Sequence, residues 1–346
     1  MYYEEFSPGD KFLSRGRTVT ETEGVQFVNM AWYLNPRCTD AEFVRKGYIW
    51  NGVELHHRIV PPPMGTFLAG GLARSIGILN DTQMAVLATT WRAPGVIAFG
   101  DTIHLEMQVT DKRDAEREDA GIVVFDMRVF NQKGELVNND QQVSLVARRP
   151  EFGGPADAAP YFFATIDDQK GHFECPQAPS SPRRQAQMTS QYFEDFVVGD
   201  AFDTRSRTVT EADVCGLIAL SWDHHPLYTD AEYARRTRFK GRIAPPLLGI
   251  GYAVGLDAPL AMAAGTCLGF THTDWRFVGP IRVGDTIQLR QTIGSKTETD
   301  ERTGIVTLDM DIVNERGGIS ISGTRYMVVL RKPAEEAAKQ KLMAWH

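Results

Sequence analysis

Polar and apolar residues alternate along four segments of the chain, two in each half. The segments 103–109 and 123–129 place apolar residues at every second position, and the segments 287–293 and 306–312 repeat the pattern. A period of two is typical of antiparallel strands with one buried face. An N-x-x-G sequence follows the later segment of each half and predicts a hairpin turn. Each half is therefore predicted to contain an antiparallel sheet.

A proline-led apolar segment precedes the predicted strands in each half. It reads P-P-P-M-G-T-F-L-A-G-G-L-A from Pro61 and P-P-L-L-G-I-G-Y-A-V-G-L from Pro245. Proline favours the first turn of a helix, and a helix that is apolar on every face is buried. We therefore expect one buried central helix in each half.

Shorter helices are predicted upstream of these central helices. T-V-T-E offers Thr20 and Thr210 as N-caps, with acidic residues in the first turn. These helices are expected to end near Pro36 and Pro226. A second capped start, T-D-A-E, follows in both halves at 39–42 and 229–232.

The two halves are copies of one unit. R-T-V-T-E at 17–21 returns at 207–211, an offset of 190 residues. R-I-V-P-P at 58–62 returns as R-I-A-P-P at 242–246, an offset of 184, so the first half carries a six-residue insertion before Arg58. We expect repeats at 1–150 and 192–333, a Pro- and Ser-containing linker at 151–191 and a tail at 334–346.

Composition narrows the classes of function. The chain has 346 residues, 42% hydrophobic content and a net charge of -7, which argue for a globular protein without a nucleic-acid partner. Its four cysteines are scattered and form no C-x-x-C pair, so neither a disulfide framework nor a zinc site is expected. The acidic N-terminus and the absence of a long apolar run favour a soluble, cytoplasmic protein without membrane contact.

Ordered motifs in both halves resemble a known family. They include F-E-D-F-V-V-G-D, R-T-V-T-E-A-D-V, W-D-H-H-P-L-Y and F-V-G-P-I-R-V-G-D-T-I. Together they resemble the MaoC-like (R)-specific enoyl-CoA hydratases and dehydratases. The resemblance implies an α+β double hot-dog fold, in which each of two tandem repeats has a buried central helix wrapped by a curved antiparallel sheet.

The family signature G-D-x-N-P-L-H points to the second half as the catalytic one. In the family, its Asp and His jointly take a proton from water and deliver a proton to an enoyl thioester. Asp223 stands at the Asp position, Tyr228 at the His position and His225 at the Asn position. Asp223 could instead be a loop residue bonded to backbone, Tyr228 could simply pack, and His225 could only hold the loop.

The first half lacks both signature groups, because it reads Tyr33 and Cys38 where the family has Asp and His. It is therefore predicted to be the non-catalytic half that forms an acyl pocket.

In the family, a backbone N–H at the start of the central helix polarises the thioester carbonyl. Pro245 and Pro246 have no N–H to donate, so the donor is expected at Leu247 or Leu248, with Gly249 allowing close approach.

Two further features are candidates for substrate contacts. His57, just before the central helix of the first half, could cover the pocket or could belong to a surface loop. Five cations could bind CoA phosphates or could be a solvated turn; they are Arg235, Arg236, Arg238, Lys240 and Arg242.

The sequence thus predicts a lyase of the EC 4.2.1 type that adds water to a 2-enoyl thioester or removes it from a 3-hydroxyacyl thioester, in fatty acid or polyketide metabolism. Asp223 acts with Tyr228 or His225. The thioester is expected to be CoA-linked, with no other cofactor and no metal, and the protein is expected to be a homodimer. A thioesterase on the same fold and a non-catalytic acyl-thioester binding protein or partner subunit remain alternatives.

Overall fold

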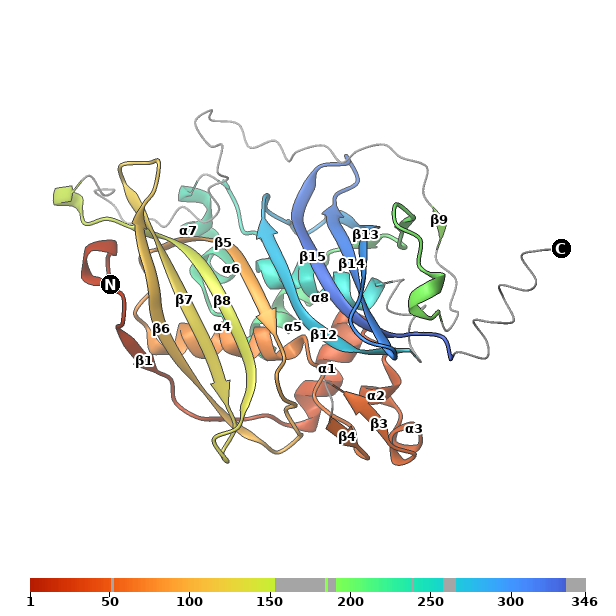
Figure 1. Cartoon of the computed structure of the whole chain (residues 1–346). Helices are drawn as coiled ribbons and strands as arrows, with labels where there is room; N and C mark the ends of the chain where they lie inside the picture. Colours follow the sequence, from red (N-terminus) through yellow and green to blue (C-terminus); the bar gives the residue numbers. More distant parts are fainter. Residues whose placement is uncertain (51–52, 153–183, 186–190, 238, 258–265, 334–346) are drawn as a thin grey trace.

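The computed structural model describes residues 1–50, 53–152, 184–185, 191–237, 239–257 and 266–333. Within these residues, thirteen strands form one sheet that continues from the first half into the second. Figure 1 shows the sheet curving around the helices, with the first half and the second half side by side. The antiparallel pairing of β5 (Gln83–Arg92) with β12 (Cys267–Phe277) joins the two halves.

The two halves use the same strand order. The path is β1-β6-β7-β8-β5 in the first half and β12-β15-β14-β13-β10-β9 in the second, with β2 beside β6 and β11 beside β13. The first-half strands are β1 (Lys11–Leu13), β2 (Arg17–Thr18), β6 (Thr102–Asp114), β7 (Ala120–Phe130) and β8 (Leu136–Ala147). The others are β9 (Arg184–Gln185), β10 (Ala201–Asp203), β11 (Arg207–Thr208), β13 (Thr286–Glu298), β14 (Thr303–Val313) and β15 (Ile319–Leu330).

The predicted strands are confirmed, with their apolar positions facing the helices. Ile103, Leu105, Met107 and Val109 of β6 are buried while the residues that alternate with them are partly exposed. Gly134 and Gly317 lie in the hairpin turns with φ of 77° and 80°, a conformation that glycine adopts without strain.

The helices lie along the concave side of the sheet. They are α1 (Glu21–Ala31), α2 (Pro36–Thr39), α3 (Ala41–Arg45), α4 (Met64–Ile76), α5 (Glu211–Ser221), α6 (Pro226–Thr229), α7 (Ala231–Arg236) and α8 (Pro246–Leu256), with short 3-10 turns at Tyr3–Glu5, Pro150–Phe152 and Phe193–Asp195. Thr20 and Thr210 accept hydrogen bonds from the backbone N–H of Glu23 and Asp213, which confirms both N-caps.

The expected ends of α1 and α5 were wrong. The helices end at Ala31 and Ser221, well before the prolines, because Trp32 and Trp222 adopt left-handed backbone conformations. The prolines instead begin α2 and α6, where the missing N–H costs no hydrogen bond.

The six-residue insertion of the first half falls in a region that forms a small hairpin, β3 (Tyr48–Trp50) with β4 (Val53–Leu55). Most of the predicted linker and all of the tail lie outside the described residues. No helix of the described part is long and apolar enough to cross a membrane.

The central helix of each half passes very close to the end of the capped helix of the other half. A Cβ on Gly71 of α4 would lie 1.5 Å from the carbonyl oxygen of Ser221, and a Cβ on Gly255 of α8 would lie 1.6 Å from that of Ala31. Only glycine permits this approach. The end of α5 is therefore held directly against α4.

Each half also supplies an arginine to the other. The Arg17 guanidinium donates to the carbonyl oxygens of Leu220 and Ser221 and stacks 3.8 Å from the Trp222 ring. Arg207 donates to the carbonyl oxygen of Met30 and stacks 4.1 Å from the Trp32 ring. These reciprocal contacts satisfy carbonyls that a helix end leaves without partners.

Candidate active site

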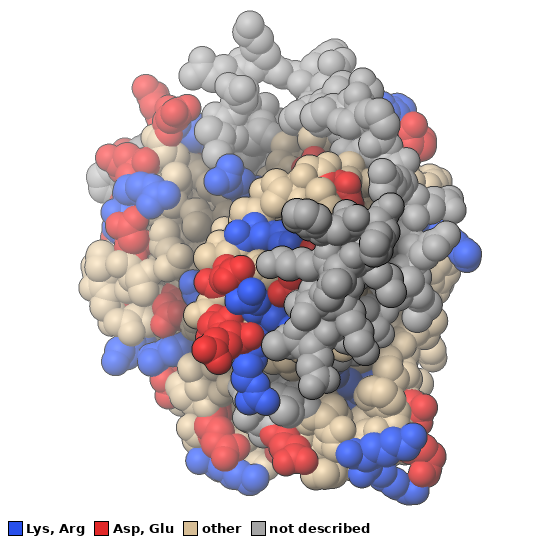
Figure 2. Space-filling model, turned by 45° about the vertical axis from the view of Figure 1, so that its right-hand side comes forward, with Lys and Arg blue, Asp and Glu red and all other residues tan. Residues whose placement is uncertain are grey.

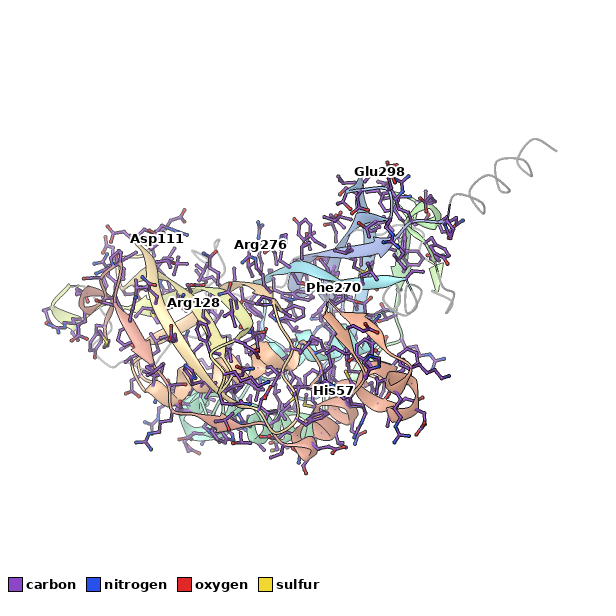
Figure 3. The ribbon with its side chains drawn as sticks, turned by 60° about the horizontal axis from the view of Figure 1, so that its bottom comes forward. His57, Asp111, Arg128, Phe270, Arg276 and Glu298 are labelled. Carbon is purple, nitrogen blue, oxygen red and sulfur yellow. The ribbon has the colours of Figure 1, made fainter. Side chains whose placement is uncertain are left out.

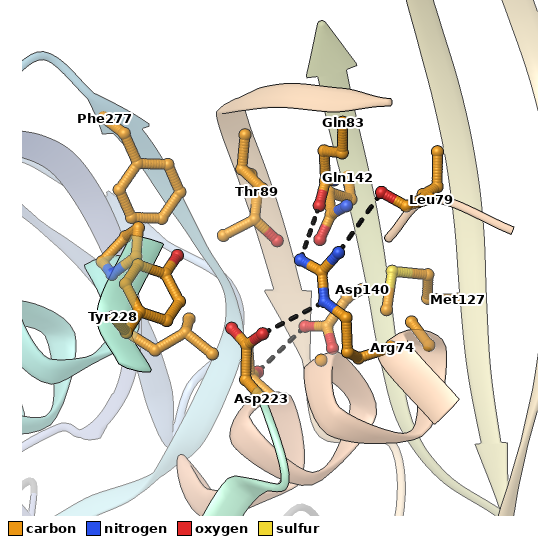
Figure 4. A pocket seen from close by; sticks show the side chains of 16 residues that line it. Arg74, Leu79, Gln83, Thr89, Met127, Asp140, Gln142, Asp223, Tyr228 and Phe277 are labelled. Atoms are coloured by element: carbon orange, nitrogen blue, oxygen red, sulfur yellow. Dashed lines mark hydrogen bonds and ion pairs between the residues drawn. The ribbon is translucent and has the colours of Figure 1, made fainter. Parts of the chain in front are cut away.

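A cavity at the boundary of the two halves contains the predicted catalytic loop (Figure 4). The second half contributes Asp223, Tyr228, Pro246, Leu247 and Phe277. The first half contributes the rest of the wall, which is Thr66, Gly70, Ala73, Arg74, Leu79, Gln83, Val86, Thr89, Met127, Asp140 and Gln142. The loop of one half therefore faces a pocket built mainly by the other.

Asp223 is positioned by the abrupt end of α5. Trp222 turns the chain out of the helix, and the Asp223 N–H donates to the Ser221 hydroxyl at 3.2 Å. Because Arg17 and Gly71 fix the backbone at Ser221, the carboxylate is held in place by contacts from the first half.

Arg74 is the cation of the cavity. Its Nε lies 3.2 Å from Asp223 Oδ1, and its Nη2 donates to Gln83 Oε1 at 2.9 Å. Both partners of the ion pair are mostly buried, with side chains 12% and 14% exposed. Asp223 Oδ2 accepts no hydrogen bond from any described residue, so this oxygen is available to a molecule in the cavity.

Tyr228 lies across the cavity from Arg74 (Figure 4) and is fully buried. Burial raises the pKa of its phenol well above the usual value, and the nearby Asp223 carboxylate raises it further. The phenol is therefore protonated at neutral pH, a state that can donate a hydrogen bond but cannot serve as a base.

His225 lies in the same loop but lines a different hollow, next to Trp222 and Pro226. Its Nδ1 accepts a hydrogen bond from the Leu227 N–H at 3.1 Å, which caps α6. Asn35 does the same for α2 at the corresponding position of the first half. Burial lowers the pKa of His225 to about 2, so the ring is neutral. These contacts are those expected of a residue that holds the loop.

The start of α8 reaches the cavity through Leu247. The Leu248 N–H already donates to the Pro245 carbonyl oxygen at 2.9 Å, whereas the Leu247 N–H has no acceptor among the described residues. Gly249 approaches core side chains instead of the cavity, because a Cβ there would lie 2.6 Å from Ile281 Cδ1 and 2.7 Å from Ile321 Cδ1. Of the three candidates, only Leu247 lines the cavity.

His57, labelled in Figure 3, is exposed and lies outside the cavity lining. Arg235, Arg236, Lys240 and Arg242 also lie outside the lining. Arg235 pairs with Glu232, and Arg242 donates to Glu211 Oε1 at 2.7 Å and to the Tyr228 carbonyl oxygen at 3.2 Å. Arg236 and Lys240 are exposed, and Arg238 lies outside the described residues. Figure 2 shows cations and carboxylates interspersed on one face.

The sequence prediction missed the polar wall of the first half. Helix α4 was expected to be apolar on every face, but it carries Thr66 and Arg74 into the cavity. Asp140 and Gln142 come from β8, where N-N-D-Q-Q occupies the middle of a strand inside the sheet. The polar run within a central strand was the signal that could have revealed them, because polar side chains are rarely buried unless they are hydrogen-bonded or paired.

The equivalent position around the loop of the first half is filled. Tyr33 and Cys38 are buried. The adjoining space is lined by Arg325, which forms a fully buried ion pair with Asp257. Among the described residues, the loop that follows the capped helix therefore brings a carboxylate to a cavity in the second half and not in the first.

Comparisons with known proteins agree with this asymmetry. Residues 195–314 match the family model of the MaoC like domain. Protein MaoC of Klebsiella aerogenes is 33% identical over 113 residues, which are 33% of this chain and 33% of that protein. The (R)-specific enoyl-CoA hydratase of Rhodospirillum rubrum is 29% identical over 102 residues, 30% of this chain and 69% of that enzyme. The chain thus spans only about a third of the length of Protein MaoC.

The whole chain is similar to a solved structure. Rv0216 from Mycobacterium tuberculosis, described as having a double hot-dog fold, superposes with a TM-score of 0.69 at 13% identity, over 95% of this chain and 98% of that one. The fold predicted from the sequence is confirmed. This chain has the double hot-dog fold, and its residues 195–314 are similar to the MaoC like domain.

Proposed function

We propose that this protein is a hydratase or dehydratase that adds water to a 2-enoyl thioester or removes it from a 3-hydroxyacyl thioester. The observation that carries the proposal is Asp223, a carboxylate with one unbonded oxygen in a cavity next to the start of a buried helix. The similarity of 30% of this chain to an (R)-specific enoyl-CoA hydratase supports a CoA-linked substrate.

The residues divide the chemistry as follows. Asp223 Oδ2 takes a proton from water, which attacks the β-carbon of the enoyl group. The Leu247 N–H at the start of α8 donates to the thioester oxygen, on which negative charge develops. Tyr228, as a protonated phenol, donates a hydrogen bond to the substrate or to the attacking water. The reaction transfers no electrons to or from the substrate as a whole, so it requires no redox cofactor.

Incubation with crotonyl-CoA tests this function. We expect the enoyl absorbance to fall without release of free thiol. Asp223→Asn should lower kcat about 100-fold while the folded structure persists. Thiol release would favour the thioesterase, and binding without either change would favour the acyl-thioester binding protein.

A further inference from the structure

Asp140 is a second carboxyl group in the cavity, and the reaction described above does not use it. It lies in the middle of β8 and is only 2% exposed, yet it lines the same cavity as Asp223. The structurally equivalent residue in the second half is Gly323, where a Cβ would lie 2.5 Å from the Trp275 ring. A carboxyl group at this level of the sheet is therefore specific to the half that forms the cavity.

Neighbouring side chains fix the orientation of the Asp140 carboxyl group. The Trp91 Nε1–H donates to Asn138 Oδ1 at 2.7 Å, and Asn138 Nδ2 donates to Asp140 Oδ2 at 2.9 Å. Because an indole N–H is only a donor, it determines which end of the Asn138 amide faces Asp140. Asp140 Oδ2 must then be an acceptor, and a proton on Asp140 must reside on Oδ1.

The other carboxyl oxygen, Asp140 Oδ1, contacts a residue of the cavity wall. It lies 2.9 Å from the hydroxyl of Thr66, another residue of the cavity wall. A hydroxyl can accept as well as donate, so Thr66 can bond to Asp140 in either protonation state. A proton on Asp140 Oδ1 can therefore be donated to the Thr66 oxygen, and the two hydroxyl hydrogens need not point at each other.

The surroundings favour the protonated form. No described cation forms an ion pair with Asp140, since Arg74, on α4, is directed to Asp223 and Gln83. The pKa of Asp140 is raised to about 7, chiefly by burial; the hydrogen bonds from Thr66 and Asn138 act to lower it, and the charge of Asp126 on the adjacent β7 acts to raise it. Two carboxyl groups in one cavity whose environments differ in this way suit the roles of acid and base.

We propose that Asp140 is the proton donor of the reaction and takes the place of the missing family histidine. This inference rests on the hydratase function proposed above. In hydration, Asp223 takes one proton from water as the oxygen bonds to the β-carbon, and Asp140 gives its Oδ1 proton to the α-carbon as the enolate collapses. The proton on Asp223 then returns to Asp140 through water in the cavity, which restores both groups.

The test compares the wild type, Asp140→Asn and Asp309→Asn in crotonyl-CoA hydration. Asp309, on β14 of the second half, accepts a hydrogen bond from the Thr324 hydroxyl and lies outside the cavity lining, so it serves as the matched control. We expect Asp140→Asn to lower kcat about 100-fold with little change in KM, and Asp309→Asn to keep most of the activity. Full turnover by a folded Asp140→Asn would overturn the inference while leaving the proposed function intact.

The pH profile of the wild type gives a second, independent measurement. Because the donor must be protonated, the hydration rate should fall as pH rises through about 7, and this alkaline limb should be absent from the residual activity of Asp140→Asn. A wild-type rate that stays constant from pH 6 to pH 9 would also overturn the inference. A wild type without any hydration of enoyl thioesters would instead overturn the function itself, together with the inference.

Discussion

Arg74 Nε and Asp223 Oδ1, which are 3.2 Å apart, form an ion pair between the two halves of the chain. Arg74 belongs to the central helix of the first half, and Asp223 to the loop after α5 in the second. The pair fixes one carboxylate oxygen and leaves the other facing the cavity. The active site therefore depends on how the halves pack and not on either half alone.

Arg74→Gln should lower both turnover and stability. The substitution leaves a mostly buried carboxylate without its cation, which costs about 1–3 kcal/mol, and it frees Asp223 to rotate. We expect kcat for crotonyl-CoA hydration to fall at least about 10-fold, measured beside a urea denaturation curve.

Arg128→Gln is the matched control. Arg128 is also ion-paired, to Glu106 and Asp126, but it lies outside the cavity lining, on the sheet of the first half (Figure 3). Its replacement should change neither kcat nor the stability of the folded state appreciably. Equal effects of the two substitutions would contradict a specific role for Arg74.

Tyr228→Phe should separate hydrogen bonding from packing. If the phenol donates to the substrate or water, removal of its hydroxyl should lower kcat about 10-fold and leave the folded state nearly as stable. Tyr228→Ala should instead destabilise the protein by about 3–5 kcal/mol, because it opens a hole in the core.

Tyr233→Phe provides the comparison, since Tyr233 is a nearby tyrosine of α7 that does not line the cavity. We expect its rate to equal that of the wild type. If Tyr228→Phe also keeps the wild-type rate, the ring of Tyr228 serves only to pack.

His225→Asn should make the protein less sensitive to acid while retaining turnover. The folded state holds the pKa of His225 at about 2, against 6.5 in an unfolded chain, so between these values only the unfolded state binds the proton. Stability is therefore lost as pH falls below about 6.5. Asn keeps the cap, as Asn35 does in α2, and removes the titration.

Urea denaturation at pH 7 and pH 5 measures the difference. Between pH 7 and pH 5, the free energy of unfolding should fall by on the order of 2 kcal/mol less in the variant than in the wild type. His224→Asn, at the exposed neighbouring residue, should leave the pH dependence as it is. Abolished turnover in His225→Asn would instead assign the ring a catalytic role.

Arg17→Gln and Arg207→Gln form a pair of variants matched by the internal symmetry. Each removes a guanidinium that binds carbonyls at the end of the opposite helix and pairs with an acidic residue of its own half. Both should destabilise the protein by about 1–3 kcal/mol, because each leaves helix-end carbonyls without a donor and a partly buried carboxylate without its cation.

Only Arg17→Gln should also lower kcat at a temperature where the variants are folded. Arg17 holds the loop that carries Asp223, whereas Arg207 holds the loop of Tyr33. Steady-state kinetics below the unfolding transition would show this difference. An equal loss of kcat in both variants would mean that the contacts act on the whole fold.

The sequence by itself determined the architecture, because the information for it is local and repeated. The period-two segments, the caps at Thr20 and Thr210 and the proline starts each specify an element within a few residues. Duplication then showed that the same elements occur twice. The resemblance to the family signature, together with the comparison of the two copies, singled out Asp223, because neither requires knowledge of packing.

The tertiary structure alone decided what surrounds Asp223. Arg74 lies 149 residues away along the chain and belongs to the other half, and Asp140 reaches the cavity from a strand between them in sequence. No periodicity in the sequence predicts that these residues lie together, because their proximity depends on Gly71, which lets α4 contact the end of α5. Burial likewise sets the protonation states of His225, Tyr228 and Asp140, since the cost of charge depends on the neighbours that only folding supplies.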